Sequence, residues 1–201
     1  MATQREPRTA KGRATRRALL DAAEEVFGEL SYDGASVAEI VRRAGVAQGT
    51  FYVYFPDKKA AFVELVRELN HELRRTIAEA ISGIEDRFEV ERVGFVTFFN
   101  YVLQHKALYR IVRESQFVDP ETYRWHYRTL AEGYVRGLEK AQADGQIRDD
   151  ISAETVAWIL MGISVLYGDR WVLWDDRVPP DEVIDEVMRF VETALRPGDG
   201  R

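Results

Sequence analysis

The sequence AGVAQGTFYVYFPDKKAAF, residues 44–62, decides the fold of this chain. Gly45 suits the left-handed conformation in which helices commonly end. Pro56 disfavours the helical conformation in the residue before it. Between these two breaks, residues 48–55 are long enough for about two helical turns. The stretch therefore predicts a short helix that is separated from its neighbours on both sides.

Two further helices are predicted before this stretch. The first starts near Thr15 and ends near residues 32–34. Its apolar residues have the spacing of a helix that buries one face: Leu19, Ala23, Val26, Phe27 and Leu30. The second starts near Val37, because Ser36 and Glu39 have the spacing of a capping box. In that motif the serine hydroxyl accepts from a first-turn amide and the glutamate reaches back.

The remainder of the chain also follows helical patterns. Asp57 suits the N-cap of a long helix over residues 58–82. Asp119-Pro120 suits a helix start, Gly145 a helix end and Ser152 another start. Further helices are predicted over residues 88–104, 106–116, 120–144, 153–174 and 181–195. Since no convincing alternating strand pattern occurs, the chain is predicted to be all-α with about nine helices.

These patterns divide the chain into four parts. Residues 1–14 are predicted to be a basic flexible arm, and residues 15–59 a three-helix domain. Residues 60–196 form a larger helical bundle, and residues 197–201 a tail.

Composition narrows the class of protein. Of 201 residues, 46% are hydrophobic and 31% are charged, which is typical of a soluble globular protein. Because there is no cysteine, disulfides and thiolate metal sites are excluded. No apolar run is expected to approach the roughly 18–20 residues of a membrane helix, and the basic start leads into a charged amphipathic stretch. We therefore expect a cytoplasmic protein without a membrane partner.

The net charge of −6 hides an asymmetry. Residues 1–59 hold ten Lys and Arg against eight Asp and Glu, so this part is slightly basic. The first seventeen residues contain six Lys and Arg and one acid, Glu6. A basic N-terminal part suits a polyanionic partner such as DNA, because binding requires phosphate charges to be neutralised. A solvated tail is the alternative for the arm considered alone.

The second and third predicted helices are short and are separated by Gly45-Val46. Together with the first helix they have the layout of a helix-turn-helix. The segment 15–62 resembles the DNA-binding domain of the TetR family of bacterial repressors. Features that match are the turn at Asp33-Gly34, the capped second helix, Gly49-Thr50, Tyr52, Phe55 and the lysine after Pro56-Asp57. Beyond this segment, only length, helix number and pattern resemble the family.

Three residues of the third helix have side chains suited to DNA. The amide of Gln48 can pair with adenine, and Thr50 can offer a hydroxyl to phosphate or a methyl group to thymine. Tyr52 can reach a phosphate with its hydroxyl, although burial in the core is its alternative. Phe55 is expected in the core.

The family resemblance implies further positions near DNA. It places Ser36 and Lys58 where the family contacts phosphate, and it adds Gly49 and Tyr54 as candidates. Ala47 departs from the family, which often has a serine that caps the recognition helix and touches phosphate there. The start of that helix is therefore expected to be weaker, by about 1 kcal/mol.

The larger domain is rich in aromatic residues, most of which suit a core. Together they exceed what a bundle of this size needs, which favours a cavity for a small molecule. The family resemblance implies an effector pocket in this domain, and arginines among the aromatics suggest an apolar or aromatic ligand with an acidic end, such as an acyl-CoA. The predicted effector-binding residues are Phe95, Phe98, Phe99, Tyr109, Arg113, Gln116, Phe117, Tyr123, Tyr127 and Trp158.

The last two helices are more apolar than outer helices of a monomer should be. The resemblance implies that these helices pair across a two-fold axis as a four-helix bundle. The predicted interface residues are Val156, Ile159, Leu160, Ile163, Val183, Val187, Phe190 and Val191. A homodimer presents two recognition helices, so a near-palindromic duplex operator is expected.

These observations predict a ligand-responsive repressor without a cofactor. An enzyme is not expected, because His71, His105 and His126 lack the spacing of metal or catalytic motifs. One alternative is an activator, or a regulator without an effector. Another is a ligand-binding or catalytic helical bundle whose N-terminal domain mediates protein contacts.

Overall fold

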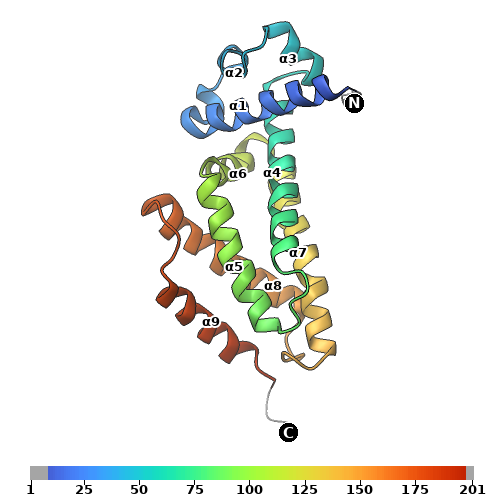
Figure 1. Cartoon of the computed structure of the whole chain (residues 1–201), viewed down its shortest axis with the longest axis vertical. Helices are drawn as coiled ribbons and strands as arrows, with labels where there is room; N and C mark the ends of the chain where they lie inside the picture. Colours follow the sequence, from blue (N-terminus) through green and yellow to red (C-terminus); the bar gives the residue numbers. More distant parts are fainter. Residues whose placement is uncertain (1–8, 198–201) are drawn as a thin grey trace. The chain divides into compact units, whose positions relative to one another are not determined.

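The structure is a computed structural model that describes residues 9–197, except the side chain of Leu108, and this range contains helices and no strand (Figure 1). The all-α prediction is confirmed. Within the described range the elements are α1 (Ala10–Gly34), α2 (Val37–Ala44), α3 (Gln48–Tyr54), α4 (Lys58–Ala80), α5 (Arg87–Gln104), α6 (Ala107–Val118), α7 (Pro120–Ala143), α8 (Ala153–Tyr167), the π-helix η1 (Gly168–Trp174) and α9 (Asp181–Leu195).

Local sequence signals account for most helix boundaries. Four predicted N-caps accept a hydrogen bond from the backbone N–H three residues later: Ser36 from Glu39, Asp57 from Ala60, Asp119 from Thr122 and Ser152 from Thr155. Gly45 and Gly145 follow α2 and α7 with φ of 67° and 71°. Because this left-handed conformation favours glycine, both predicted helix ends are confirmed.

The predicted capping box is only half present. The Ser36 hydroxyl accepts from Glu39 N–H at 3.2 Å. The Glu39 carboxylate, however, accepts from Arg42 and from Arg43, each with a shortest distance below 3 Å. Charged donors on the same helix therefore replace the expected bond to the serine backbone.

Helix α1 starts earlier than predicted, ends at Gly34 within the predicted residues 32–34, and contains a kink that was not predicted. It begins at Ala10 instead of near Thr15, with Thr9 accepting from Gly12 N–H at 3.1 Å. Near its C-terminus the backbone is kinked at Ser31, where φ is 59° and ψ is 168°. This conformation is almost restricted to glycine and costs on the order of 1–3 kcal/mol for other residues. Residues 1–8 and 198–201, with Arg5 and Arg8 of the predicted arm, lie outside the described range.

The chain forms two compact units. The first contains the described residues up to Leu69 together with Ala107–His126, and the second contains Asn70–Lys106 together with the described residues from Tyr127 onward. The predicted division after residue 59 differs from this, because α6 packs on α1. Helices α4 and α7 each begin in the first unit and end in the second.

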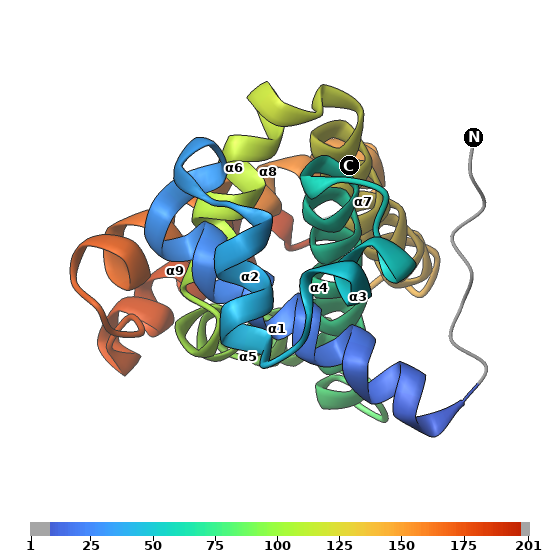
Figure 2. The same cartoon turned by 90° about the horizontal axis from the view of Figure 1, so that it is seen from above.

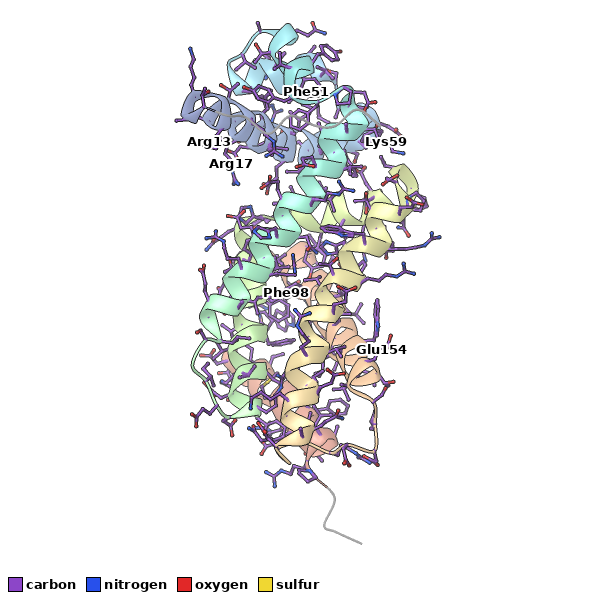
Figure 3. All side chains as sticks on the ribbon, turned by 90° about the vertical axis from the view of Figure 1, so that its right-hand side faces the viewer. Arg13, Arg17, Phe51, Lys59, Phe98 and Glu154 are labelled. Atoms are coloured by element: carbon purple, nitrogen blue, oxygen red, sulfur yellow. The ribbon has the colours of Figure 1, made fainter. Side chains whose placement is uncertain are left out.

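Aromatic side chains form the core of the first unit. Phe27, Phe51, Phe55 and Phe62 are at most 1% exposed. The rings of Phe27 and Phe62 meet edge to face with centroids 5.1 Å apart, and those of Phe51 and Phe55 are 5.4 Å apart. Figure 3 labels Phe51 where α3 meets the rest of this unit. The prediction that Phe55 belongs to the core is confirmed.

The second unit joins α5 to α9 and to η1. Arg92 of α5 pairs with Asp185 of α9 at 2.6 Å, and Phe95 packs edge to face on Phe99. The segment Ala153–Trp174 is long and apolar enough to cross a membrane by length and composition, with a mean hydropathy of 1.3. This corrects the expectation that no apolar run approaches that length. Core helices of soluble proteins can be equally long and equally apolar.

Candidate nucleic-acid interface

Helices α2 and α3 are joined by a tight turn. Gly45 ends α2 in the left-handed conformation, and Val46 N–H donates to Val41 O at 3.1 Å. The side chain of Phe51 anchors α3, because it is fully buried while most of its neighbours on that helix are not. Figure 2 shows α2 and α3 next to α1, as in a helix-turn-helix.

The outer face of α3 carries the predicted base-reading residues. Gln48 and Gly49 are exposed, Tyr52 is 52% exposed, and Thr50 is half-buried. The alternative that Tyr52 is a core residue is therefore wrong. Sequence reasoning missed Val53, which is 71% exposed on the same short helix. An exposed methyl-bearing side chain on this helix is suited to the methyl group of thymine.

The start of α3 lacks a side-chain cap. Ala47 is the N-cap residue, and no side-chain hydrogen bond is made there. Three residues later, Thr50 N–H donates to Ala47 O at 2.9 Å. The first turn of α3 is thus held by backbone bonds alone, as the departure of Ala47 from serine predicts.

Substitution of this residue gives a direct test. We expect Ala47→Ser to stabilise the chain by about 1 kcal/mol, because a serine hydroxyl can accept from an unpaired amide of the first turn. Urea unfolding of both proteins measures this difference. The control is Ala38→Ser, an exposed alanine inside α2 where no cap is available. Equal stability of Ala47→Ser and the parent chain would contradict the expectation.

Two residues that the family resemblance places at phosphate already have internal partners. Lys58 Nζ donates to Tyr32 O at 2.6 Å and to Ala35 O at 2.9 Å, which occupies two of its three N–H donors. The Ser36 hydroxyl accepts from the backbone, which leaves its O–H as a donor. Tyr54 is half-buried at the end of α3. Phosphate contacts by these three residues stay predictions.

The N-terminal half of α1 carries exposed cations, two of which belong to the predicted arm 1–14. Lys11 and Arg13 are exposed, and Figure 3 shows Arg13 and Arg17 projecting from this helix. Arg17 pairs with Asp21 at 2.8 Å, whereas Arg16 pairs with Glu64 and Glu68 of α4. Lys11 and Arg13 are therefore the described residues of the basic segment best suited to phosphate.

Ion pairs from Arg43 fix α2 on α1. Its guanidinium bonds Glu29 of α1 at 2.7 Å and Glu39 of α2 at 2.8 Å. Hydrogen bonds from Arg42 and Arg43 lower the pKa of Glu39 to about 2. Glu39 therefore stays ionised throughout the physiological range, and its bonds to both arginines persist there.

The predicted effector-binding residues fall into both units. Tyr109, Arg113, Gln116, Phe117 and Tyr123 belong to the first unit, and Phe95, Phe98, Phe99, Tyr127 and Trp158 to the second. Figure 3 labels Phe98 within the second unit.

Burial divides these residues further. Phe99 is fully buried and Phe95 is 8% exposed, whereas Phe117 is 83% and Trp158 43% exposed. Phe117 and Trp158 thus face outward in the chain, contrary to a position inside a pocket. A shallow, open pocket of about 360 Å³ in the second unit is lined by Glu85, Asp86, Phe88 and Gln146, none of which was predicted. The effector pocket stays a prediction.

The predicted dimer residues also divide by burial. Val156, Leu160, Val187 and Val191 are at most 8% exposed, because they pack inside the chain's own bundle. Ile163 and Val183 are half-buried. Ile159 and Phe190 are 54% and 65% exposed. Two further apolar residues of α8 are also exposed, Trp158 at 43% and Leu166 at 63%.

A short α3 that is anchored by Phe51 and has polar side chains on its outer face defines a helix-turn-helix DNA-binding protein. Among residues 9–197 no group of three or more His, Cys, Asp or Glu could hold a metal ion.

Comparison with known proteins identifies the family. Residues 19–65 match the sequence model described as "Bacterial regulatory proteins, tetR family". The uncharacterised HTH-type transcriptional regulator YdgC of Bacillus subtilis is 31% identical over 193 residues, which are 94% of this chain and 97% of YdgC. This chain therefore belongs to the TetR family of transcriptional regulators.

More distant relatives have described regulatory roles. The transcriptional activator FasR of Mycolicibacterium smegmatis is 23% identical, covering 88% of this chain and 81% of FasR. The transcriptional repressor AcnR of Corynebacterium diphtheriae is 24% identical, covering 89% and 92%. The crystal structure of the regulator FadR from B. subtilis in complex with stearoyl-CoA has a TM-score of 0.78 at 20% identity, covering 87% of this chain and 96% of FadR. Its fold is the fold of this chain.

Proposed function

We propose that this protein is a cytoplasmic repressor that binds a near-palindromic operator as a homodimer and is released by a small apolar or aromatic effector such as an acyl-CoA. The exposed polar face of α3, with Gln48 and Tyr52, supports DNA binding. In this proposal residues 15–59 bind DNA and residues 60–196 bind the effector and the second copy. AcnR is a repressor and FadR binds stearoyl-CoA, which supports the mode of regulation and the class of ligand.

A mobility-shift titration with DNA from upstream of the gene tests this function. We expect the chain to bind this duplex and palmitoyl-CoA or an aromatic acyl-CoA to release it. If neither releases the bound DNA, the proposed class of ligand is wrong. If the chain binds no duplex at low salt, the helical bundle with a protein-binding N-terminal domain is favoured instead.

An activator is the alternative, and FasR is a relative with that role. Transcription in vitro from the same upstream DNA separates the two roles. A repressor lowers the amount of transcript when it is added, whereas an activator raises it.

The exposed apolar residues of α8 and α9 support the homodimer. In the proposed interface Trp158, Ile159, Leu166 and Phe190 bury their exposed area against a second copy, whose helices meet them across a two-fold axis. Large exposed apolar patches commonly mark such interfaces.

We expect Ile159→Glu to convert the dimer to a monomer at micromolar concentration, because each interface would bury two carboxylates without partners. Operator affinity should fall by at least about 100-fold, since a monomer holds only one half-site. Light scattering after gel filtration measures the mass. The control is Ala80→Glu, an exposed residue of α4. A dimeric Ile159→Glu protein would contradict the proposed interface.

A further inference from the structure

The kink in α1 separates two backbone groups that a continuous helix would join, namely Tyr32 N–H and Gly28 C=O. Ser31 lies between them with φ 59° and ψ 168°. Each of the two groups is bonded to a side chain of α6. Arg110 Nη1 donates to Gly28 O at 2.8 Å, and Tyr32 N–H donates to the Glu114 carboxylate, 2.9 and 3.1 Å from its two oxygens.

Helix α6 lies directly against this part of α1, within the same unit (Figures 1 and 2). A Cβ atom added to Gly28 would come within 2.4 Å of Ala107 Cβ, so the two helices are in contact. Ala107, Arg110 and Glu114 are spaced as residues on one helical face. One face of α6 thus provides both the packing surface and the two charged side chains.

The kinked segment leads directly into the helix-turn-helix. Lys58 of α4 donates to Tyr32 O and Ala35 O, and Ser36 caps α2 immediately afterwards. The conformation of Ser31 is unfavourable for a residue with a Cβ atom, so it persists only where its surroundings hold it. The bonds from Arg110, Glu114 and Lys58 provide that support.

The chain connects α6 to the second unit at both ends. Lys106 immediately before α6 and Tyr127 within α7 both belong to that unit. A change of conformation in the second unit can therefore reach α6 through the covalent chain, and reach α1 through the bonds of Arg110 and Glu114.

We propose that Arg110 and Glu114 are positioning residues through which α6 sets the orientation of the helix-turn-helix. With both bonds made, the segment 31–35 is held and α2 and α3 are placed for operator binding. A shift of α6 breaks both bonds, the segment relaxes, and operator affinity falls. This inference rests on the proposed function and names the contact that would transmit the effector signal.

Hydrogen exchange tests the positioning role without DNA. In Glu114→Ala we expect amides of residues 31–54 to exchange at least about fivefold faster, with α9 unchanged, because only the local opening is affected. The matched control is Glu121→Ala, the same change at an exposed residue of α7 in the first unit, which should exchange like the parent chain. Unchanged exchange in residues 37–54, or equally faster exchange throughout the chain, would overturn the proposal.

Rescue provides the second readout. Glycine tolerates the kink without support, so Ser31→Gly combined with Glu114→Ala should restore the exchange rates of residues 37–54 to within about twofold of the parent chain. A double variant that exchanges as fast as Glu114→Ala would show that the kink is not the element held by α6, which overturns the proposal.

Binding of the upstream duplex distinguishes this inference from the proposed function. We expect Glu114→Ala to weaken binding about fivefold to tenfold, and Ser31→Gly to reverse most of that loss. If the parent chain binds the duplex and Glu114→Ala binds it equally well, the inference fails and the proposed function stands. If the parent chain binds no duplex, the proposed function fails, and the exchange experiment still decides whether α6 positions α2 and α3.

Discussion

Replacing Arg87 with alanine is expected to lower the free energy of unfolding by about 3–5 kcal/mol, the typical cost of breaking a buried ion pair. Arg87 and Glu91 pair within α5, and their side chains are only 8% and 5% exposed. The Tyr134 hydroxyl donates to the same carboxylate, and burial and the charge of Glu91 raise the pKa of Tyr134 well above 10. Without Arg87, the carboxylate would stay buried with no charged partner.

The comparison variant removes the whole cluster. In Arg87→Met combined with Glu91→Leu and Tyr134→Phe, no polar group is left unpaired, so stability should remain near that of the parent chain. Arg92→Ala is the control for an exposed ion pair and should cost less than about 1 kcal/mol. Urea unfolding measures all three. If Arg87→Ala cost no more than Arg92→Ala, the ion pair would not be buried in solution.

Acidification is expected to destabilise the chain through His126. Burial lowers the pKa of this histidine from 6.5 to about 4, so it stays neutral in the folded state while the unfolded chain takes up a proton. Because the pKa of His126 is lower in the folded state than in the unfolded chain, its contribution to the free energy of unfolding is fully present above the unfolded pKa. That contribution is lost as the pH falls from about 6.5 toward 4. Between pH 7 and pH 5 we expect a loss of about 2 kcal/mol.

Unfolding by urea at pH 7, 6 and 5 measures this slope. His126→Gln should show a flatter dependence on pH, because glutamine does not titrate. His71→Gln, at an exposed position of α4, should keep the slope of the parent chain. If the free energy of unfolding depended on pH equally in the parent chain and in His126→Gln, groups other than His126 would cause the sensitivity to acid.

Short-range signals made most of the helix boundaries predictable. A cap such as Ser36 or Asp57 satisfies backbone groups within three residues, and Gly45 ends α2 by its own backbone freedom. The outer face of α3 was predictable for the same reason, since one buried residue, Phe51, orients a short helix. The exposure of the Tyr52 and Gln48 side chains follows from that orientation.

The roles of charged residues were less predictable. The family resemblance places Lys58 at phosphate, and the structure adds two internal partners that no local pattern indicates, the carbonyl oxygens of Tyr32 and Ala35. The apolar residues of α8 and α9 show the same limitation. A periodic pattern marks Val156 and Ile159 alike as apolar, whereas 2% and 54% exposure separate a core residue from a surface one.

Local signals therefore account for the helices and the helix-turn-helix, because capping, helix-breaking residues and apolar spacing act within a few residues of the chain. The position of α6 against α1 depends instead on tertiary contacts, in which Glu114 accepts from Tyr32 N–H and Arg110 donates to Gly28 O. These partners lie more than eighty positions apart, and no local pattern records them. The strained backbone of Ser31 has the same origin, since only neighbours from other helices can hold a conformation that the residue itself disfavours.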